Sequence, residues 1–500
     1  MKNIQILTYI SLACIIFSFQ SCQKGILNLT PPDQLSTTVF WQSPADADLA
    51  LTGLYSSLYA TCANDWGTSQ YTVPNWDNFS DDSYGQYNYG GGRDALTSGI
   101  TPFSQQFVYS YYANNYIAIG SVNTFLANVS KVLTGEKLNA YLGEAHFLRA
   151  FNYFWLAQLY GNVPIIKENP FSVNYQKGMA KSTRDEVLAF VIQDLDSAIL
   201  TLPATKYSSG HAVKSTAQGY KVRVLLFEKK YAEAAALAKQ IIDGNTYSLN
   251  SSYPGNFYKP DQNASTELMF SVKYLLPNIQ HAYVGFAVAN QRWKGYLATQ
   301  DLINEYESGD PRKTMNFFFQ GDTQAQGWPF TGDLSVATPG KDSWIVGFYA
   351  VKKWLTPGMV NPDYGALDDN DFVLLRYADI KLMYAEAQNE ASGPDGGVYQ
   401  QINDVRNRPG VNMPPLPSGL SKDAMRSAIR HERRVELAFE GLRYFDLRRW
   451  GTAAQKLNGF VQNPLAPAIA TKYEAKYDFW PIPQTEIDRN TPLLIQNPGY

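Results

Sequence analysis

The sequence predicts a mostly α-helical fold in which helix pairs support a large loop-rich insertion. Apolar residues recur at helical spacing over most of the 500-residue chain. Two long segments, residues 62–105 and 250–370, break this pattern and are rich in Gly, Asn and aromatic residues. Short strand-like runs interrupt the second segment at 267–274 and 344–351. Long loops in a compact protein usually carry function, so these two segments are the first candidates for a site.

The first predicted helices occupy residues 43–58, 107–132 and 137–160. Ser43 can cap the first of them, and Pro44 suits its opening turn. The third helix has the clearest apolar stripe. That stripe consists of Leu138, Leu142, Ala145, Leu148, Phe151 and Trp155.

The next predicted helix, residues 183–202, opens with a capping box between Thr183 and Glu186. Residues 213–228 and 231–243 then form a helix pair, and small residues in its second helix allow close packing. This pattern is typical of tetratricopeptide helix pairs, although no regular repeat of about 34 residues is present. Further helices are predicted at residues 376–391, 397–407 and 422–450.

The amino terminus has the order of a bacterial secretory signal. Lys2 is followed by an apolar run at residues 4–19, which is shorter than the roughly 20 residues of a membrane span, and then by Ser21 and Cys22. A cysteine directly after the cleavage point is typical of a lipoprotein. The alternative is an ordinary signal peptide with an unrelated cysteine. The expected division is a signal peptide, a lipidated tether and one domain, at residues 1–21, 22–35 and 36–500.

Composition excludes several classes of protein. The chain has 42 basic and 45 acidic residues and a formal net charge of −3, which argues against nucleic-acid binding. Once the signal is removed and Cys22 is acylated, only Cys62 remains, so no internal disulfide is expected. Charged residues make up 17% of the chain and aromatic residues 14%. Tyr and Trp suit surfaces that bind sugars or peptides, because they combine flat apolar faces with a polar edge.

Several motifs, spread in order along the chain, resemble the SusD/RagB family of outer-membrane lipoproteins. The strongest is IRHERRVELAFEGLRYFDLRRW at residues 429–450. The others are AHFLRAFNYF at 145–154, YGNVPI at 160–165, FVLLRYADIKLMYAEA at 372–387, INDVRNRPGV at 402–411, WPIPQTEI at 480–487 and QNPGY at 496–500. Together they cover essentially the whole chain.

This resemblance implies a helical scaffold of about four tetratricopeptide-like helix pairs, with loops and small strands covering one side. It also implies a lipid anchor in the outer membrane and a position on its extracellular face. The implied partner is a SusC-like TonB-dependent transporter, over which the protein acts as a lid. The implied ligand is an oligosaccharide, although a smaller branch of the family handles peptides.

The charged residues of the strongest motif are expected to stabilise the fold rather than to form a site. Glu432, Glu436 and Glu440 alternate with arginines at spacings that can pair along one helix. The same interpretation applies to Arg149, Arg376 and Asp379.

Ligand contacts are expected instead in the two loop segments, where aromatic rings alternate with polar side chains. In the first segment the candidates are Trp66, Trp76, Asp77, Asn78, Tyr84, Tyr87, Tyr89 and Arg93. In the second they are Trp293, Tyr296 and Trp328, with Asp322 among the polar neighbours. Any single ring here could be packed in the interior, but so many rings in Gly-rich loops are hard to bury together.

No catalytic or metal-binding constellation is visible. The acidic clusters at residues 81–82 and 368–371 are expected to be exposed turns, not the rigid carboxylate pair of a glycosidase. Neither has EF-hand spacing, so no metal site or cofactor is expected, with a structural calcium ion as the alternative. The sequence therefore predicts a surface lipoprotein that binds glycan without catalysis. A peptide-binding relative and a helical-repeat adaptor with only protein partners are the alternatives.

Overall fold

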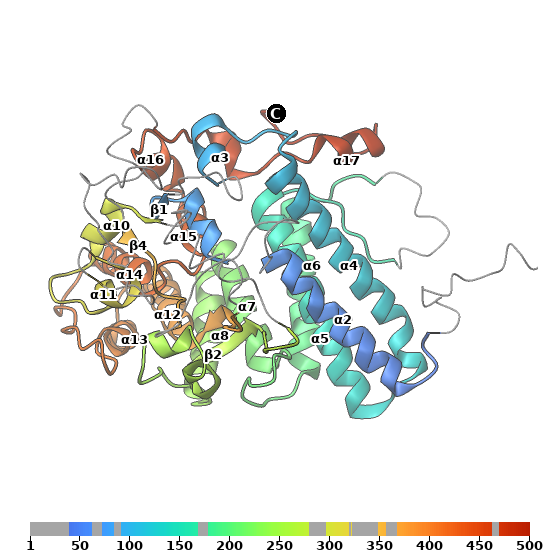
Figure 1. Cartoon of the computed structure of the whole chain (residues 1–500), viewed down its shortest axis with the longest axis horizontal. Coiled ribbons are helices and arrows are strands. Elements are labelled where there is room, and N and C mark those ends of the chain that lie inside the picture. The colour runs from blue at the N-terminus through green and yellow to red at the C-terminus, as the bar shows by residue number, and fades with distance from the viewer. Residues whose placement is uncertain are drawn as a thin grey trace, which may run out of the picture.

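The computed structural model describes residues 40–62, 73–84, 92–168, 179–279, 297–319, 322, 349–356, 368–462 and 470–500. Cys22, the signal and the tether lie outside these residues. Figure 1 shows a helical body with the helices of residues 44–62 and 110–201 on one side and those of residues 377–436 on the other. Within the described ranges, no helix combines the length and the hydropathy needed to cross a membrane. The predicted mostly helical fold is confirmed.

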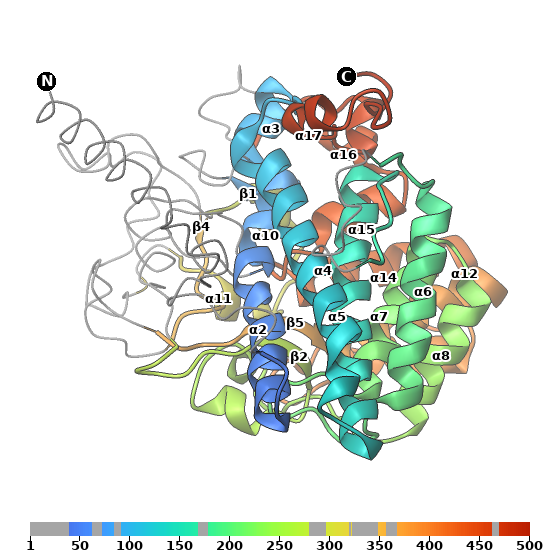
Figure 2. The same ribbon diagram turned by 90° about the vertical axis from the view of Figure 1, so that its right-hand side faces the viewer.

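Long helices form the amino-terminal part of the body. They are α2 (Pro44–Cys62), α4 (Ser110–Asn128), α5 (Gly135–Tyr160), α6 (Arg184–Thr201), α7 (Lys214–Phe227) and α8 (Tyr231–Asp243). From α4 onward each helix packs against the next, as in tetratricopeptide helix pairs (Figure 2). The helices predicted for this part of the chain are confirmed, with small shifts at their ends.

Local chemistry sets the ends and the spacing of these helices. The predicted capping box is present at the start of α6, where the Glu186 N–H donates to Thr183 Oγ1 at 3.3 Å and the Thr183 N–H donates to Glu186 Oε2 at 2.7 Å. Helix α5 ends at Gly161, which adopts a left-handed φ of 69°. Gly143 lets α5 approach the end of α6, because a Cβ there would lie 2.5 Å from Thr201 Oγ1.

The carboxyl-terminal helices extend the same body. They are α12 (Tyr377–Ser392), α13 (Gly396–Arg406), α14 (Lys422–Glu436), α15 (Arg443–Arg449), α16 (Ala453–Leu457) and α17 (Gln484–Arg489). Helix α12 packs against α8, α13 and α14 and so joins the two parts. The single helix predicted at 422–450 is wrong. The chain breaks between α14 and α15, where Phe439 and Gly441 adopt φ values of 60° and 72°.

Two small sheets lie within and beside the insertion. Strand β2 (Leu268–Val272), which the sequence predicted, pairs with β5 (Phe372–Arg376), which it did not. Both strands are buried along their whole length. This pair therefore joins the beginning of the insertion to the chain that directly follows its end. The second sheet has the order β1 (Ser83–Tyr84), β3 (Leu297–Ala298) and β4 (Tyr349–Ala350).

The two segments predicted as loops contain more regular structure than expected. Short helices occur in their described parts, since turns of a few residues give no lasting period in the sequence. In and near the first segment they are η2 (Val73–Phe79), α3 (Gly92–Ser98) and η4 (Gln105–Tyr109). In the second they are η6 (Pro254–Asn256), η7 (Asp261–Ala264), α10 (Gln300–Glu305) and α11 (Arg312–Asn316). The remaining short helices are η5 (Val129–Lys131) and η8 (Ala475–Asp478).

Candidate functional site

The sheet β1–β3–β4 joins the two segments in which ligand contacts were predicted. Its strands are antiparallel, with β3 in the centre, and Tyr84 pairs with Leu297. Residues 85–91 directly follow β1, residues 280–296 directly precede β3, and residues 323–348 directly precede β4. The points where these aromatic-rich segments leave the scaffold therefore lie side by side, although they are far apart in the sequence.

Two half-buried aromatic rings meet at β4: Tyr349 belongs to the strand, and Phe319 packs against it. The ring centroids of Phe319 and Tyr349 are 5.0 Å apart, and the Tyr349 hydroxyl donates to Gln300 Oε1 at 3.0 Å. Asp322, a predicted polar neighbour, accepts a 2.9 Å hydrogen bond from the Phe319 N–H, and its carboxylate lies 3.8 Å from Lys352 Nζ. Phe319, Tyr349 and Gln300 were not among the contacts predicted from the sequence. The sequence feature that could have identified them is their position at the borders of the aromatic-rich segments.

The structure contradicts the predicted ligand contact of Trp76, which is 1% exposed. Its ring centroid lies 4.8 Å from that of Tyr111 and 5.0 Å from that of Phe445. The rings around it belong to Phe79, Tyr111, Trp155, Tyr444, Phe445 and Trp480. A sugar could stack on Trp76 only if this cluster opened, because packed rings already occupy its faces.

Asp77, Asn78 and Tyr84 are also buried, so the same correction applies to them. Asp77 Oδ2 accepts a 3.0 Å hydrogen bond from the Gly441 N–H, at the break between α14 and α15. Asn78 Oδ1 accepts from Ser83 Oγ at 2.5 Å. Tyr84 packs against Leu297 within the small sheet. These side chains hold residues 73–84 against the scaffold. An alternation of aromatic and polar residues in the sequence is compatible with this packing role as well as with ligand contact.

The remaining predicted contacts are not placed by the structure and stay predictions. Arg93 belongs to α3 by its backbone, but its side chain is not described. The others lie outside the described residues: Trp66, Tyr87, Tyr89, Trp293, Tyr296 and Trp328.

The acidic pair Asp81–Asp82 ties the first segment to α14 and α15. Arg443 Nη2 donates to Asp81 Oδ2 at 2.7 Å, and Arg434 Nε donates to Asp82 Oδ1 at 2.7 Å. Both carboxylates are about 1% exposed, so the prediction of exposed turn residues is wrong. Burial raises the pKa of Asp82 to about 6. Burial also disfavours the charge of Asp81, but Arg434 and Arg443 outweigh it and lower the pKa of Asp81 to about 2.

A second buried network joins the insertion to α14. Glu436 accepts hydrogen bonds from Arg376 at 2.6 Å and from Arg312 and Arg408 at 2.8 Å. Arg376 also donates to Glu440 at 2.7 Å. The predicted role of these charges in stabilising the fold is confirmed. The predicted pairing along one helix is wrong, because the partners come from separate elements.

The other acidic cluster is mostly buried, with Asp368 and Asp371 enclosed and Asp369 half-buried. Asp371 is fully buried and accepts from Lys273 Nζ at 2.6 Å, which contradicts the predicted exposed turn. Burial raises the pKa of Asp368 to about 6. Within the described ranges, no group of His, Cys, Asp and Glu side chains has the geometry to hold a metal ion. Asp81, Asp82 and Asp371 are each engaged by a cation, so these carboxylates serve the fold.

Comparisons with known proteins agree with this architecture. The SusD family model matches residues 231–500, and the model described as "Starch-binding associating with outer membrane" matches residues 30–226. SusD-like protein P2 of Formosa agariphila is 25% identical over an alignment covering 100% of both chains. The SusD-like protein of Bacteroides ovatus is 23% identical, over 86% of this chain and 80% of its own.

Solved structures have the same fold. A SusD-like carbohydrate-binding protein from Bacteroides fragilis superposes with a TM-score of 0.79 at 22% identity, covering 90% of this chain and 99% of its own. Surface glycan-binding protein A from Bacteroides thetaiotaomicron, in complex with laminarihexaose, gives a TM-score of 0.73 at 20% identity, covering 91% and 100%. The SusD family model alone spans more than half of the sequence, so the chain belongs to the SusD family.

Proposed function

We propose that the chain is a cell-surface lipoprotein that captures a neutral oligosaccharide and passes it to a SusC-like TonB-dependent transporter. The observation that carries this proposal is the sheet β1–β3–β4, to which all three aromatic-rich stretches are attached. Sugar capture needs several rings and hydroxyl partners on one surface. The sheet brings the points at which these stretches are attached, which are far apart in the sequence, next to one another. No chemical step is part of the proposal.

The similar proteins support a glycan ligand. One solved relative is described as a carbohydrate-binding protein, and another holds laminarihexaose. The description of the matching amino-terminal model names starch binding and the outer membrane. The half-buried rings of Phe319 and Tyr349 offer the described part of such a surface, with Gln300 and Asp322 as polar partners.

Cys22 supplies the membrane attachment in this proposal. Acylation there, followed by the polar tether, would hold the protein to the outer membrane and let it swing over a transporter. Metabolic labelling with a fatty acid tests this part. The wild type should carry the label and sediment with membranes, while Cys22→Ala should lose both properties. A labelled Cys22→Ala variant would contradict the assignment of the anchor.

The ligand is tested by titrating the full chain with neutral oligosaccharides, maltohexaose and laminarihexaose among them, and with a matched set of peptides. Removal of one stacking ring should weaken glycan binding about tenfold, on the order of 1.4 kcal/mol. We expect this loss for Trp66→Ala, Trp293→Ala and Tyr349→Ala. Phe103→Ala is the matched control, because Phe103 is 69% exposed and belongs to none of the stretches attached to β1–β3–β4.

The other outcomes separate the alternatives. Binding of peptides and of no glycan would overturn the proposal in favour of a peptide-binding family member. Co-purification with a transporter without any ligand would favour a protein-only adaptor. Glycan binding that survives all three substitutions would leave the function standing but move the site away from the sheet.

A further inference from the structure

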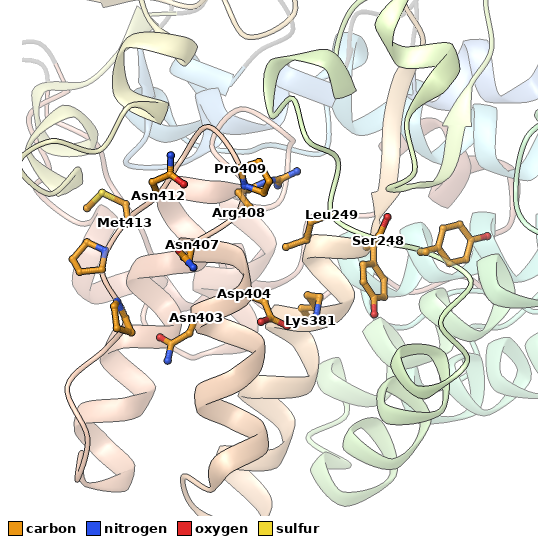
Figure 3. A pocket seen from close by; sticks show the side chains of 14 residues that line it. Ser248, Leu249, Lys381, Asn403, Asp404, Asn407, Arg408, Pro409, Asn412 and Met413 are labelled. Atoms are coloured by element: carbon orange, nitrogen blue, oxygen red, sulfur yellow. Dashed lines mark hydrogen bonds and ion pairs between the residues drawn. The ribbon is translucent and has the colours of Figure 1, made fainter.

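A pocket of about 580 Å³ lies between α12, α13 and the chain that follows α8 (Figure 3). This volume falls within the range of small-ligand sites in proteins. Residues 247–249 form one wall, Tyr377 and Lys381 of α12 form another, and residues 403–415 close it from α13 and the loop after it. These elements differ from those that carry the sheet β1–β3–β4, so the pocket is distinct from the surface proposed above.

The charged side chains of the pocket are already neutralised by protein partners. Lys381 Nζ donates to Asp404 Oδ2 at 2.8 Å and to Gln401 Oε1 at 2.7 Å. Arg408, which is 1% exposed, donates to Glu436 Oε1 at 2.8 Å and is also bonded to Glu267. A phosphate, a carboxylate or a cation would have to compete with these ion pairs. The pocket therefore fits a neutral ligand.

Hydrogen-bonding groups remain free in the pocket. In the described part of the chain, the amides of Asn407 and Asn412 and the hydroxyl of Tyr377 make no hydrogen bond to another protein group. Figure 3 shows Asn407 just past the end of the helix that carries Asn403 and Asp404, with Asn412 on the loop above. Amides and hydroxyls that both donate and accept match the vicinal hydroxyls of a sugar.

The apolar wall argues against a peptide as the occupant. Pro409, Pro414 and Pro415 are exposed and have no backbone N–H, so this wall cannot extend a β-sheet to an added strand. The rings of Tyr247 and Tyr377 are only 5% and 4% exposed, so they do not form the open aromatic groove that a polyproline helix needs. The proline rings instead offer C–H surface against which a sugar ring can pack.

We propose that this pocket is a second glycan subsite, in which Asn407, Asn412 and Tyr377 hold a short neutral stretch of the saccharide. Burial raises the pKa of Tyr377 to about 12, so its hydroxyl stays protonated and able to donate at neutral pH. This inference rests on the proposed function and extends it, because a polymer that reaches both sites gains avidity that a short oligosaccharide does not.

The test compares a polysaccharide with its hexasaccharide on the full chain, using starch with maltohexaose and laminarin with laminarihexaose. The variant combines Asn407→Ala, Tyr377→Phe and Asn412→Gly, the last because Asn412 has a φ of 53° that glycine tolerates. Asn139→Ala is the control, since Asn139 is exposed on α5, away from the pocket. Melting temperatures check that each variant is folded.

We expect the wild type and Asn139→Ala to bind the polysaccharide at least about tenfold more tightly than the hexasaccharide. The triple variant should lose this gain while its affinity for the hexasaccharide stays unchanged. A triple variant that keeps the gain, or a wild type without one, overturns the second subsite but leaves the proposed function intact. A wild type that binds no neutral glycan overturns both.

Discussion

Different interactions stabilise two regions of the molecule. The helical body consists of the helices α2, α4 to α8 and α12 to α14, and the loop-bearing side consists of the described parts of residues 62–105 and 250–370. In the body, apolar stripes of neighbouring helices meet, as where the rings of Phe147 and Phe151 lie 5.4 Å and 5.3 Å from that of Tyr220. On the loop-bearing side, buried ion pairs join distant residues, as in Asp82 with Arg434, which are 352 positions apart. The comparison shows that buried charges join distant segments of the loop-bearing side to the scaffold, whereas the helices of the body combine apolar packing with buried pairs between neighbouring helices, such as Arg149 with Asp194.

The largest expected effect comes from breaking the buried network on the loop-bearing side. Arg376→Ala would leave Glu267, Glu436 and Glu440 buried without their shared cation, at a cost of about 3–5 kcal/mol in the free energy of unfolding. Denaturant titration measures this loss. The control is Lys239→Ala, which removes an exposed pair with Asp243 and should leave the free energy of unfolding almost unchanged. If Arg376→Ala lowered the free energy of unfolding as little as Lys239→Ala does, the buried network would not be what stabilises the loop-bearing side.

Trp76 distinguishes packing from ligand contact at the border between the two regions. Trp76→Ala should lower the free energy of unfolding by about 3–5 kcal/mol, because it leaves a cavity among six surrounding aromatic rings. Trp76→Phe should cost less and keep the protein folded for binding assays. Glycan affinity of the folded protein should not change. Weaker binding with unchanged stability would restore Trp76 as a ligand contact.

The dependence of stability on pH tests the buried carboxylates of the loop-bearing side. The pKa of Asp368 is about 6 in the folded protein, above its ordinary value of 3.8, so its ionised form destabilises the fold. Stability should therefore rise as the pH falls from about 7 towards 4, where the folded state takes up this proton first. At pH 8 Asp368→Asn should melt at a higher temperature than the wild type, and the difference should close by about pH 4. A constant difference would show that the charge of Asp368 is not the cause.

At still lower pH, protonation of Asp379 makes the folded protein less stable. The charges of Arg223 and Arg433 outweigh burial and lower the pKa of Asp379 to about 2, so its contribution is lost as the pH falls from about 4 through 2. The wild type should consequently be most stable at mildly acidic pH.

The smallest effect is expected at a helix end in the body. Thr183→Ala removes the capping hydrogen bond of α6 and should cost about 1 kcal/mol. Thr134 occupies the same position before α5 but makes no side-chain cap, so Thr134→Ala should have almost no effect. Thermal melts of the two variants provide the comparison. Equal losses would mean that the cap is not the source of the stability.

The sequence predicted the helical body well because its signals are local. The stripe of α5, the capping box at Thr183 and the turn after α7 each involve residues within a few positions of one another. The burial of Trp76 was not predictable in this way, since Trp480 packs against it from the far end of the chain. The break at Phe439 was hidden because the same residues continue a helical pattern. In the sheet β1–β3–β4, strand β4 falls within the strand-like run predicted at 344–351, whereas β1 and β3 are too short to leave any period.

The assignment of the ligand site is tested most directly by a crystal structure of the full chain with the neutral glycan that it binds most tightly. We predict sugar rings against aromatic side chains of the segments attached to β1–β3–β4, with Trp76 still enclosed in the core. Sugar seen only along the helices α4 to α8, with the sheet-bearing surface empty, would contradict the assignment of this side as the site.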